Sequence, residues 1–151
     1  MATMKTKNKY IYDAHSDVVF KAAGAAAITA TATSTVLSLN KLSGAYWDNN
    51  EIPVRELTIA IVVTACDFTT GDETYVMTAE VAASSGFSTA YEVAHQQILG
   101  GSGVGAYSLV IDLDSVVQLG VTPSHIRLKA TLAGTSPSLT YAAWIAQGSA
   151  A

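Results

Sequence analysis

The chain has 151 residues and a mass of 15.7 kDa, which is enough for one domain to bury its own core without disulfides or metal ions. Half of the residues are hydrophobic, but only 13% are charged, against about 25% in an ordinary soluble domain. This composition, with a mean hydropathy of +0.31, excludes an intrinsically disordered chain. The shortage of charge predicts that other subunits cover much of the surface.

Charge is divided unevenly, and we expect an N-terminal arm, residues 1–17, ahead of a single domain, residues 18–151. Residues 1–21 carry four lysines and two aspartates, whereas the remainder carries four basic and ten acidic residues. Three hypotheses remain open for the arm: a phosphate-seeking segment, a solvated terminus, or an arm that reaches an acidic neighbouring subunit. Its spaced lysines fall short of a basic block, so no nucleic-acid partner is expected. The candidate contact residues in the arm are Lys5, Lys7, Lys9, Tyr10 and Tyr12.

The chain contains no segment typical of a membrane span or a secretory signal. The longest uncharged run, between Lys21 and Lys41, holds seven threonine, serine and asparagine residues, and a spanning helix needs about 20 mainly apolar ones. The N-terminal lysines are not followed by the apolar stretch of a signal peptide. We therefore expect a protein made in a cytoplasm, with no membrane partner. Its lone cysteine, Cys66, ends an apolar run and is expected to be packed in the interior.

Hydrophobic periodicity predicts seven or eight strands. Apolar and hydroxyl side chains alternate over residues 28–36, which is typical of a half-exposed strand. Residues 57–64 are almost wholly apolar and β-branched, which predicts a central strand covered on both faces. Further strands are predicted at residues 74–81, 90–99, 107–113, 125–132 and 139–146.

The connections between these segments are short and rich in glycine, serine and proline, and no long helix separates the strands. The expected fold is therefore all-β: an antiparallel two-sheet sandwich, or jelly roll, of about eight strands with an extended N-terminal arm. Residues 114–120 predict one short helical turn, capped by Asp114 or Ser115 and stopped at Gly120. Asp112 and Asp114, on an exposed strand edge, are interpreted as a guard against unwanted strand pairing.

Patterns that carry catalysis or ligand binding are weak. The three histidines, His15, His95 and His125, lie in separate segments without metal-ligand spacing. Residues 101–106 match a glycine-rich dinucleotide fingerprint, but a strand rather than a helix is predicted to follow it. The acidic residues 67–73 lack the pattern of a calcium loop and are interpreted as a solvated turn. We expect no enzyme, no cofactor and no metal site.

Aromatic residues give the best indication of a partner. Tyr46 and Trp47 lie in a polar loop, residues 43–53, and both residue types are favoured at protein interfaces. They are therefore candidate interface residues. The alternative, that Trp47 folds back as a lid on the sandwich, has equal weight. Trp144, within a predicted strand, is expected in the core.

Four stretches carry a resemblance to a known family: the alternating Thr/Ala/Ser strand near the N-terminus, the block ELTIAIVVTACDFTTGDETYVMTAEVAASSGFSTA, the strand HIRLKATLAG and the terminal strand LTYAAWIAQ. In this order they resemble the small jelly-roll cement, or decoration, proteins of tailed-phage capsids. The resemblance runs from about Val18 to the C-terminus. The residues before Val18 match no pattern of the family, so no contacts carry over to the arm.

The resemblance implies a structural virion protein that is synthesised in the host cytoplasm and sits on the capsid exterior. Such a protein is a homotrimer that binds the major capsid protein at capsomer junctions and stabilises the lattice. Two alternatives stay open: a carbohydrate-binding β-sandwich, which also uses exposed aromatic residues and acidic loops, and a tail-fibre or spike component.

Overall fold

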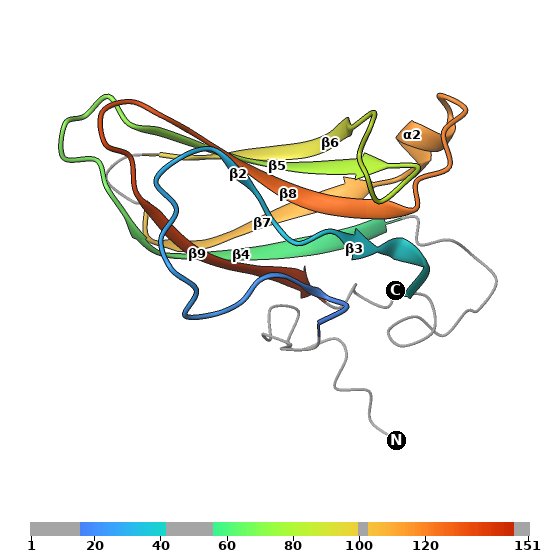
Figure 1. Ribbon diagram of the computed structural model, residues 1–151, viewed down its shortest axis with the longest axis horizontal. Helices are drawn as coiled ribbons and strands as arrows, with labels where there is room; N and C mark the ends of the chain where they lie inside the picture. The colour runs from blue at the N-terminus through green and yellow to red at the C-terminus, as the bar shows by residue number, and fades with distance from the viewer. Residues whose placement is uncertain (1–15, 42–55, 100–102, 147–151) are drawn as a thin grey trace, which may run out of the picture.

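Six long strands account for most of the fold, and each forms where an alternating or β-branched segment predicts it. They are β4 (Glu56–Cys66), β5 (Thr74–Ala82), β6 (Tyr91–Ile98), β7 (Gly105–Asp112), β8 (His125–Ala133) and β9 (Leu139–Ala146). The shorter elements are β1 (Val19–Lys21), β2 (Ala32–Thr33), β3 (Leu37–Ser38), the 3-10 turn η2 (Leu39–Lys41) and the helical turn α2 (Asp114–Val117). The computed structural model describes residues 16–41, 56–99 and 103–146 (Figure 1).

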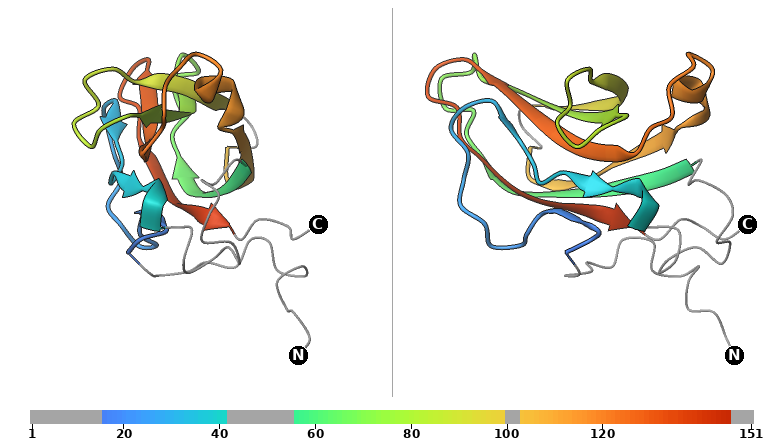
Figure 2. Two further views of the ribbon diagram at one scale, coloured as in Figure 1. Left: turned by 90° about the vertical axis from the view of Figure 1, so that its right-hand side faces the viewer. Right: turned by 45° about the vertical axis from the view of Figure 1, so that its right-hand side comes forward.

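The strands form two antiparallel sheets that lie face to face (Figure 2). Sheet A has the order β1-β9-β4-β7, and sheet B has the order β2-β8-β5-β6. The short strand β3 pairs with β8 further along the edge that β2 occupies. Counted as one interrupted strand, β2 and β3 bring each sheet to four positions, with most connections crossing between the sheets. This is a jelly-roll arrangement, and it confirms the expected fold class.

The core lies between the inward faces of the two sheets. Tyr75, Met77, Ala79 and Val81 of β5 are fully buried there, while the residues between them point outward. Leu57, Ile59, Ile61 and Val63 do the same on β4, together with Ile126, Leu128 and Ala130 on β8. Each large apolar side chain buried in this way contributes about 1.5–3 kcal/mol. The period-two pattern that predicted the strands is therefore the pattern of the core.

Strand β4 is covered on its outward face as well, as its continuous apolar sequence predicts. Ala60 there is only 2% exposed, and Trp144 of β9 only 4%. Ala60 lies opposite Trp144 in the β4–β9 register, and Ala142 and Ala146 complete a second apolar cluster. Trp144 is thus buried, as predicted, but in a hydrophobic cluster separate from the one between the sheets. Its indole packs on the outward face of sheet A.

Residues 28–36 do not form the single half-exposed strand that their alternation predicts. Ile28 makes one isolated bridge to Leu139, and only the two residues of β2 pair regularly with β8. Hydroxyl side chains replace the backbone ladder on either side of β2. The Oγ1 of Thr31 accepts the N–H of Leu132 at 3.0 Å.

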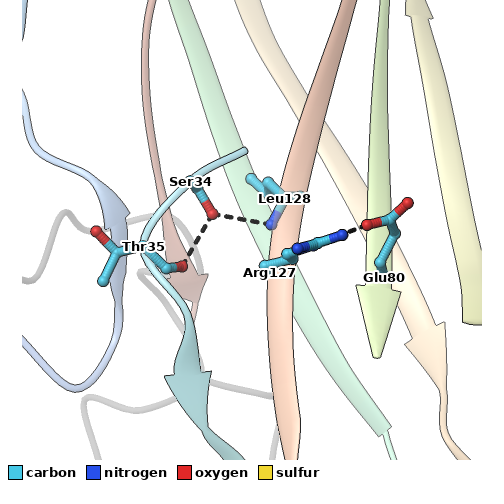
Figure 3. A network of polar contacts seen from close by, with 5 residues as sticks. All are labelled: Ser34, Thr35, Glu80, Arg127 and Leu128. Atoms are coloured by element: carbon cyan, nitrogen blue, oxygen red, sulfur yellow. Dashed lines mark hydrogen bonds and ion pairs between the residues drawn. The ribbon is translucent and has the colours of Figure 1, made fainter. Parts of the chain in front are cut away.

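Ser34 makes the corresponding contact in the gap between β2 and β3 (Figure 3). Its hydroxyl oxygen accepts the N–H of Leu128 at 2.9 Å and donates to the carbonyl of Thr35 at 3.0 Å. Its own N–H donates to the Leu128 carbonyl at 2.8 Å. The side-chain oxygens of threonine and serine thus accept backbone N–H groups of β8. The alternating pattern of residues 28–36 therefore marks a segment joined to β8 partly by side chains, and not a regular strand.

The helical turn forms at the predicted place, but its cap differs from the prediction. The N-cap is Leu113, and no side chain caps it. The Asp112 carboxylate instead accepts the Asp114 N–H at 2.9 Å. Gly120 follows the turn with a φ of +80°, a conformation that glycine adopts without strain, so it stops the turn as predicted.

Candidate functional site: the β7 surface

Exposed large hydrophobic side chains gather in one part of the described chain. All five lie within residues 99–119, where Val110 is 58% exposed and Leu119 70%. We call β7 with its two flanking connections the β7 surface; its exposed apolar residues are Leu99, Val104, Val110, Val117 and Leu119. Exposed apolar side chains grouped in this way mark a contact surface more often than scattered ones do.

Strand β7 is also a long and regular sheet edge. It pairs with β4 without a register shift, from Gly105 opposite Val63 to Asp112 opposite Glu56. Among the described strands it has no partner on its other side. Its outward-facing residues, which alternate with buried ones, are exposed: Ala106, Ser108, Val110 and Asp112. An edge of this kind is a template for pairing with another chain.

The other three sheet edges in the described part of the chain are shorter or interrupted. Strand β1 has three residues and a register shift, and the Nζ of its Lys21 lies 5.2 Å from the ring centre of Tyr141. Strands β2 and β3 have two residues each. Strand β6 meets a register shift opposite Ala79 and carries the exposed Glu92 and His95. Such irregularities and charges protect an edge, so β7 differs from the rest.

The β7 surface is acidic at the end that leads into α2. Asp112 faces Glu56 in the β4–β7 register, and Asp114 follows at the start of α2. No lysine, arginine or histidine occurs between His95 and His125. Since β7 ends at Asp112 and Asp114 belongs to the helical turn, the two aspartates do not share one strand face. The predicted guard against pairing is therefore confined to the end of the strand.

The acidic loop after β4 lies at the opposite end of β4, and its carboxylates bind the loops themselves. Asp67 accepts the N–H of Thr69 at 2.8 Å, and Glu73 accepts those of Thr70 and Gly71 at 3.1 and 2.9 Å. Their pKa values are lowered, mainly by the hydroxyl groups of Thr69 and Thr70, because hydrogen bonds favour the charged form.

A third carboxylate ties this loop to the connection between β8 and β9. Asp72 accepts the N–H and the hydroxyl of Thr135 at 3.0 and 2.8 Å, which lowers the pKa of Asp72. The residues that the structure describes contain no group of three or more His, Cys, Asp and Glu side chains suited to a metal ion. The carboxylates thus hold this loop in shape and join it to the connection between β8 and β9 by hydrogen bonds.

Cys66 lies at the end of β4 and is half-buried. Burial raises the pKa of its thiol, and the charge of Asp67 raises it further. Gly103 approaches so closely that a Cβ atom there would lie 2.1 Å from the Cys66 sulfur. The Tyr107 hydroxyl donates to the Gly103 carbonyl at 3.1 Å and fixes this approach. The thiol therefore packs against the backbone of Gly103, but it is half-buried where the sequence predicted a place in the interior.

The outward face of sheet B is polar. Arg127 donates to the Glu80 carboxylate at 2.8 Å, and its guanidinium lies 4.2 Å from the ring centre of Phe87 (Figure 3 shows the ion pair). Nearby, the ring of His95 contacts Glu92 at 2.7 Å. Beside these residues is an open hollow of about 560 Å³, lined by Val76, Thr78, Glu92, His95, Gln96 and Gln97.

The interface residues predicted from the sequence are not among the residues that the structure describes. These are Lys5, Lys7, Lys9, Tyr10, Tyr12, Tyr46 and Trp47. His15 and the first glycine of the dinucleotide-like loop, Gly101, are likewise outside the described ranges. The sequence reasoning missed the β7 surface. Its only signal was the run of Leu109, Val110 and Ile111, which as three successive apolar residues conceals the alternation.

Comparisons with known proteins add no relative. No protein-family model matches the chain, and no curated protein matches it significantly. Among the described residues, no helix has the length and hydrophobicity to cross a lipid bilayer.

Proposed function

We propose that the protein is a capsid decoration protein of a tailed phage. It binds the outside of the head as a homotrimer and stabilises the lattice of the major capsid protein. The observation that carries this proposal is the β7 surface, where a regular sheet edge and the connections at its two ends carry the exposed large apolar residues. A jelly roll with such a surface is consistent with the resemblance to decoration proteins in strand order. That resemblance is the only indication that the partner is a capsid.

The contacts that the charged side chains make within the fold also support a binding role. The loop carboxylates Asp67, Asp72 and Glu73 are hydrogen-bonded to their own loops, and Arg127 is paired with Glu80. These groups therefore stabilise the fold. Among the described residues, the exposed apolar side chains of the β7 surface have no such role in the fold and are suited to contact with other proteins.

Cosedimentation with capsids that lack the protein tests the proposal. The chain should pellet with capsids and elute alone at three times 15.7 kDa. Leu119→Lys, at the α2 end of the β7 surface, should lower capsid occupancy by roughly tenfold, because it buries a charge against the partner. The matched control is Thr131→Lys on the outward face of β8, which should bind normally. A chain that stays in the supernatant at saturating capsid concentration would contradict the proposal.

A second candidate function, binding of carbohydrate, is favoured by the polar hollow on sheet B. Its amide, carboxylate and hydroxyl groups, from Gln96, Gln97, Glu92 and Thr78, are those that bind sugar hydroxyls. Glycan-array binding by a monomer, abolished by Gln97→Ala, would establish this function in place of the first.

A further inference from the structure

The free side of β7 carries an inference that goes beyond capsid binding. In an antiparallel pair, alternate residues of an edge strand direct their N–H and C=O groups away from the partner strand. The eight residues of β7 keep one register with β4, so about half of their backbone groups face outward along a straight line. Among the described edges, β7 alone has the length and regularity to accept a further strand.

The charge of this edge selects the kind of strand that fits. Glu56 and Asp112 lie opposite each other at one end, Asp114 follows at the start of α2, and the sequence between His95 and His125 contains no lysine, arginine or histidine. Apart from Asp112, the exposed positions along β7 are small or apolar. A complementary strand therefore needs positive charge at alternate positions on one face, together with residues that favour an extended chain.

The chain itself contains a segment with these properties. Lys5, Lys7 and Lys9 occupy every second position, so an extended strand places all three on one face. Tyr10-Ile11-Tyr12 follows, and aromatic and β-branched residues favour strands. We propose that residues 1–15 of one copy add to β7 of a neighbouring copy as a fifth strand of sheet A. The lysines then face the acidic end of that edge.

The topology of sheet A is suited to a neighbour as acceptor, because donor and acceptor lie on different edges. The described chain begins at Ser16, just before β1, and β1 and β7 are the opposite edges of the sheet. A donor and an acceptor on opposite edges produce a head-to-tail contact, and repeated rotation closes such contacts into a ring. Fifteen extended residues reach up to about 50 Å, so length does not limit the exchange.

A mixing experiment tests this proposal without capsids, so its failure leaves the proposed capsid function untouched. A chain that lacks residues 2–12 keeps the acceptor edge and loses the donor. A chain with Val110→Lys keeps the donor, but its new lysine repels the arriving lysines and blocks the edge. Each chain alone should be monomeric by light scattering. Their mixture should form a complex with one copy of each.

Controls distinguish assembly from folding. Thr131→Lys adds the same charge on sheet B and should keep the wild-type assembly, while circular dichroism shows that each variant is folded. Should Val110→Lys fail to fold, Ser108→Lys provides the same block from an exposed position. Raising the salt from 50 to 500 mM should weaken the mixed complex by roughly tenfold, because exposed charges are screened.

Two outcomes would overturn the proposal. One is wild-type assembly by the chain that lacks residues 2–12, because the donor would then be unnecessary. The other is a mixture that yields no complex, which includes the case of an arm that adds to β7 of its own copy.

Discussion

Apart from Glu56 at its end, β4 with β9 turns alanine, threonine, one valine and one tryptophan outward from sheet A, whereas sheet B turns outward an arginine, a lysine and glutamates. The outward cluster of sheet A is nearly as buried as the core, while Arg127 on sheet B keeps part of its guanidinium in water and pairs with Glu80. The comparison shows that charged side chains are unevenly distributed between the two outward faces. The centre of sheet A is apolar and buried on both faces, whereas sheet B is buried on its inward face and charged on its outward face.

Removal of the indole from the outward face of sheet A is the most severe test of this comparison. Trp144→Ala should lower the free energy of unfolding by about 3–5 kcal/mol, because it leaves a cavity among Ala60, Ala142 and Ala146. Urea denaturation followed by circular dichroism measures the loss. Thr131→Ala, the matched change on sheet B, should stay within about 0.5 kcal/mol. Equal small losses at both sites would show that the two faces do not differ.

Disruption of the ion pair on sheet B should have a smaller effect. Arg127→Ala removes the donor to Glu80 and the contact with Phe87, and it should cost about 1–2 kcal/mol because Glu80 is left mostly buried. The same denaturation experiment applies. Arg127→Lys should recover part of the loss, since it restores charge without the planar contact to the ring. If Arg127→Ala left the free energy of unfolding unchanged, solvent would already screen the ion pair.

Low pH should destabilise the protein through the carboxylates of the loop after β4, and not through the outward face of either sheet. The pKa values of Asp67, Asp72 and Glu73 are lowered by hydrogen bonds, so these groups stabilise the folded chain above their ordinary pKa values of about 4. This stabilisation is lost as the pH falls through the lowered values. The urea midpoint should decline between about pH 5 and 3. Asp72→Asn should flatten that decline, and a pH profile identical to wild type would contradict this assignment.

Much of the fold follows from the sequence because its signal is local. The six long strands begin and end within two residues of the predicted ranges, as expected where side-chain alternation and burial agree. Residues 28–36 fail because the hydroxyl groups that make them alternate also bond to the neighbouring backbone. From the sequence alone, a threonine that points outward from a strand cannot be told from Thr31, which takes the place of the strand.

The candidate site was less predictable, for a different reason. Whether Val110 is buried depends on which strand lies beside β7 and on what covers that sheet, and neither is encoded within the strand itself. The low charge of the whole chain indicated a contact surface without placing it. The sequence pointed to Tyr46 and Trp47 by residue type, and that prediction lies outside the described residues.

The hydroxyl groups of Thr31 and Ser34 also bear on solubility. A sandwich with two receptive edges could grow indefinitely by cross-β stacking, since every added copy would present a new template. Where side-chain oxygens satisfy β8 and the strands are two residues long, no such template exists on the β2–β3 margin of sheet B. Thr31 and Ser34 already occupy the N–H groups of Leu132 and Leu128, which disfavours the addition of a further strand along this edge.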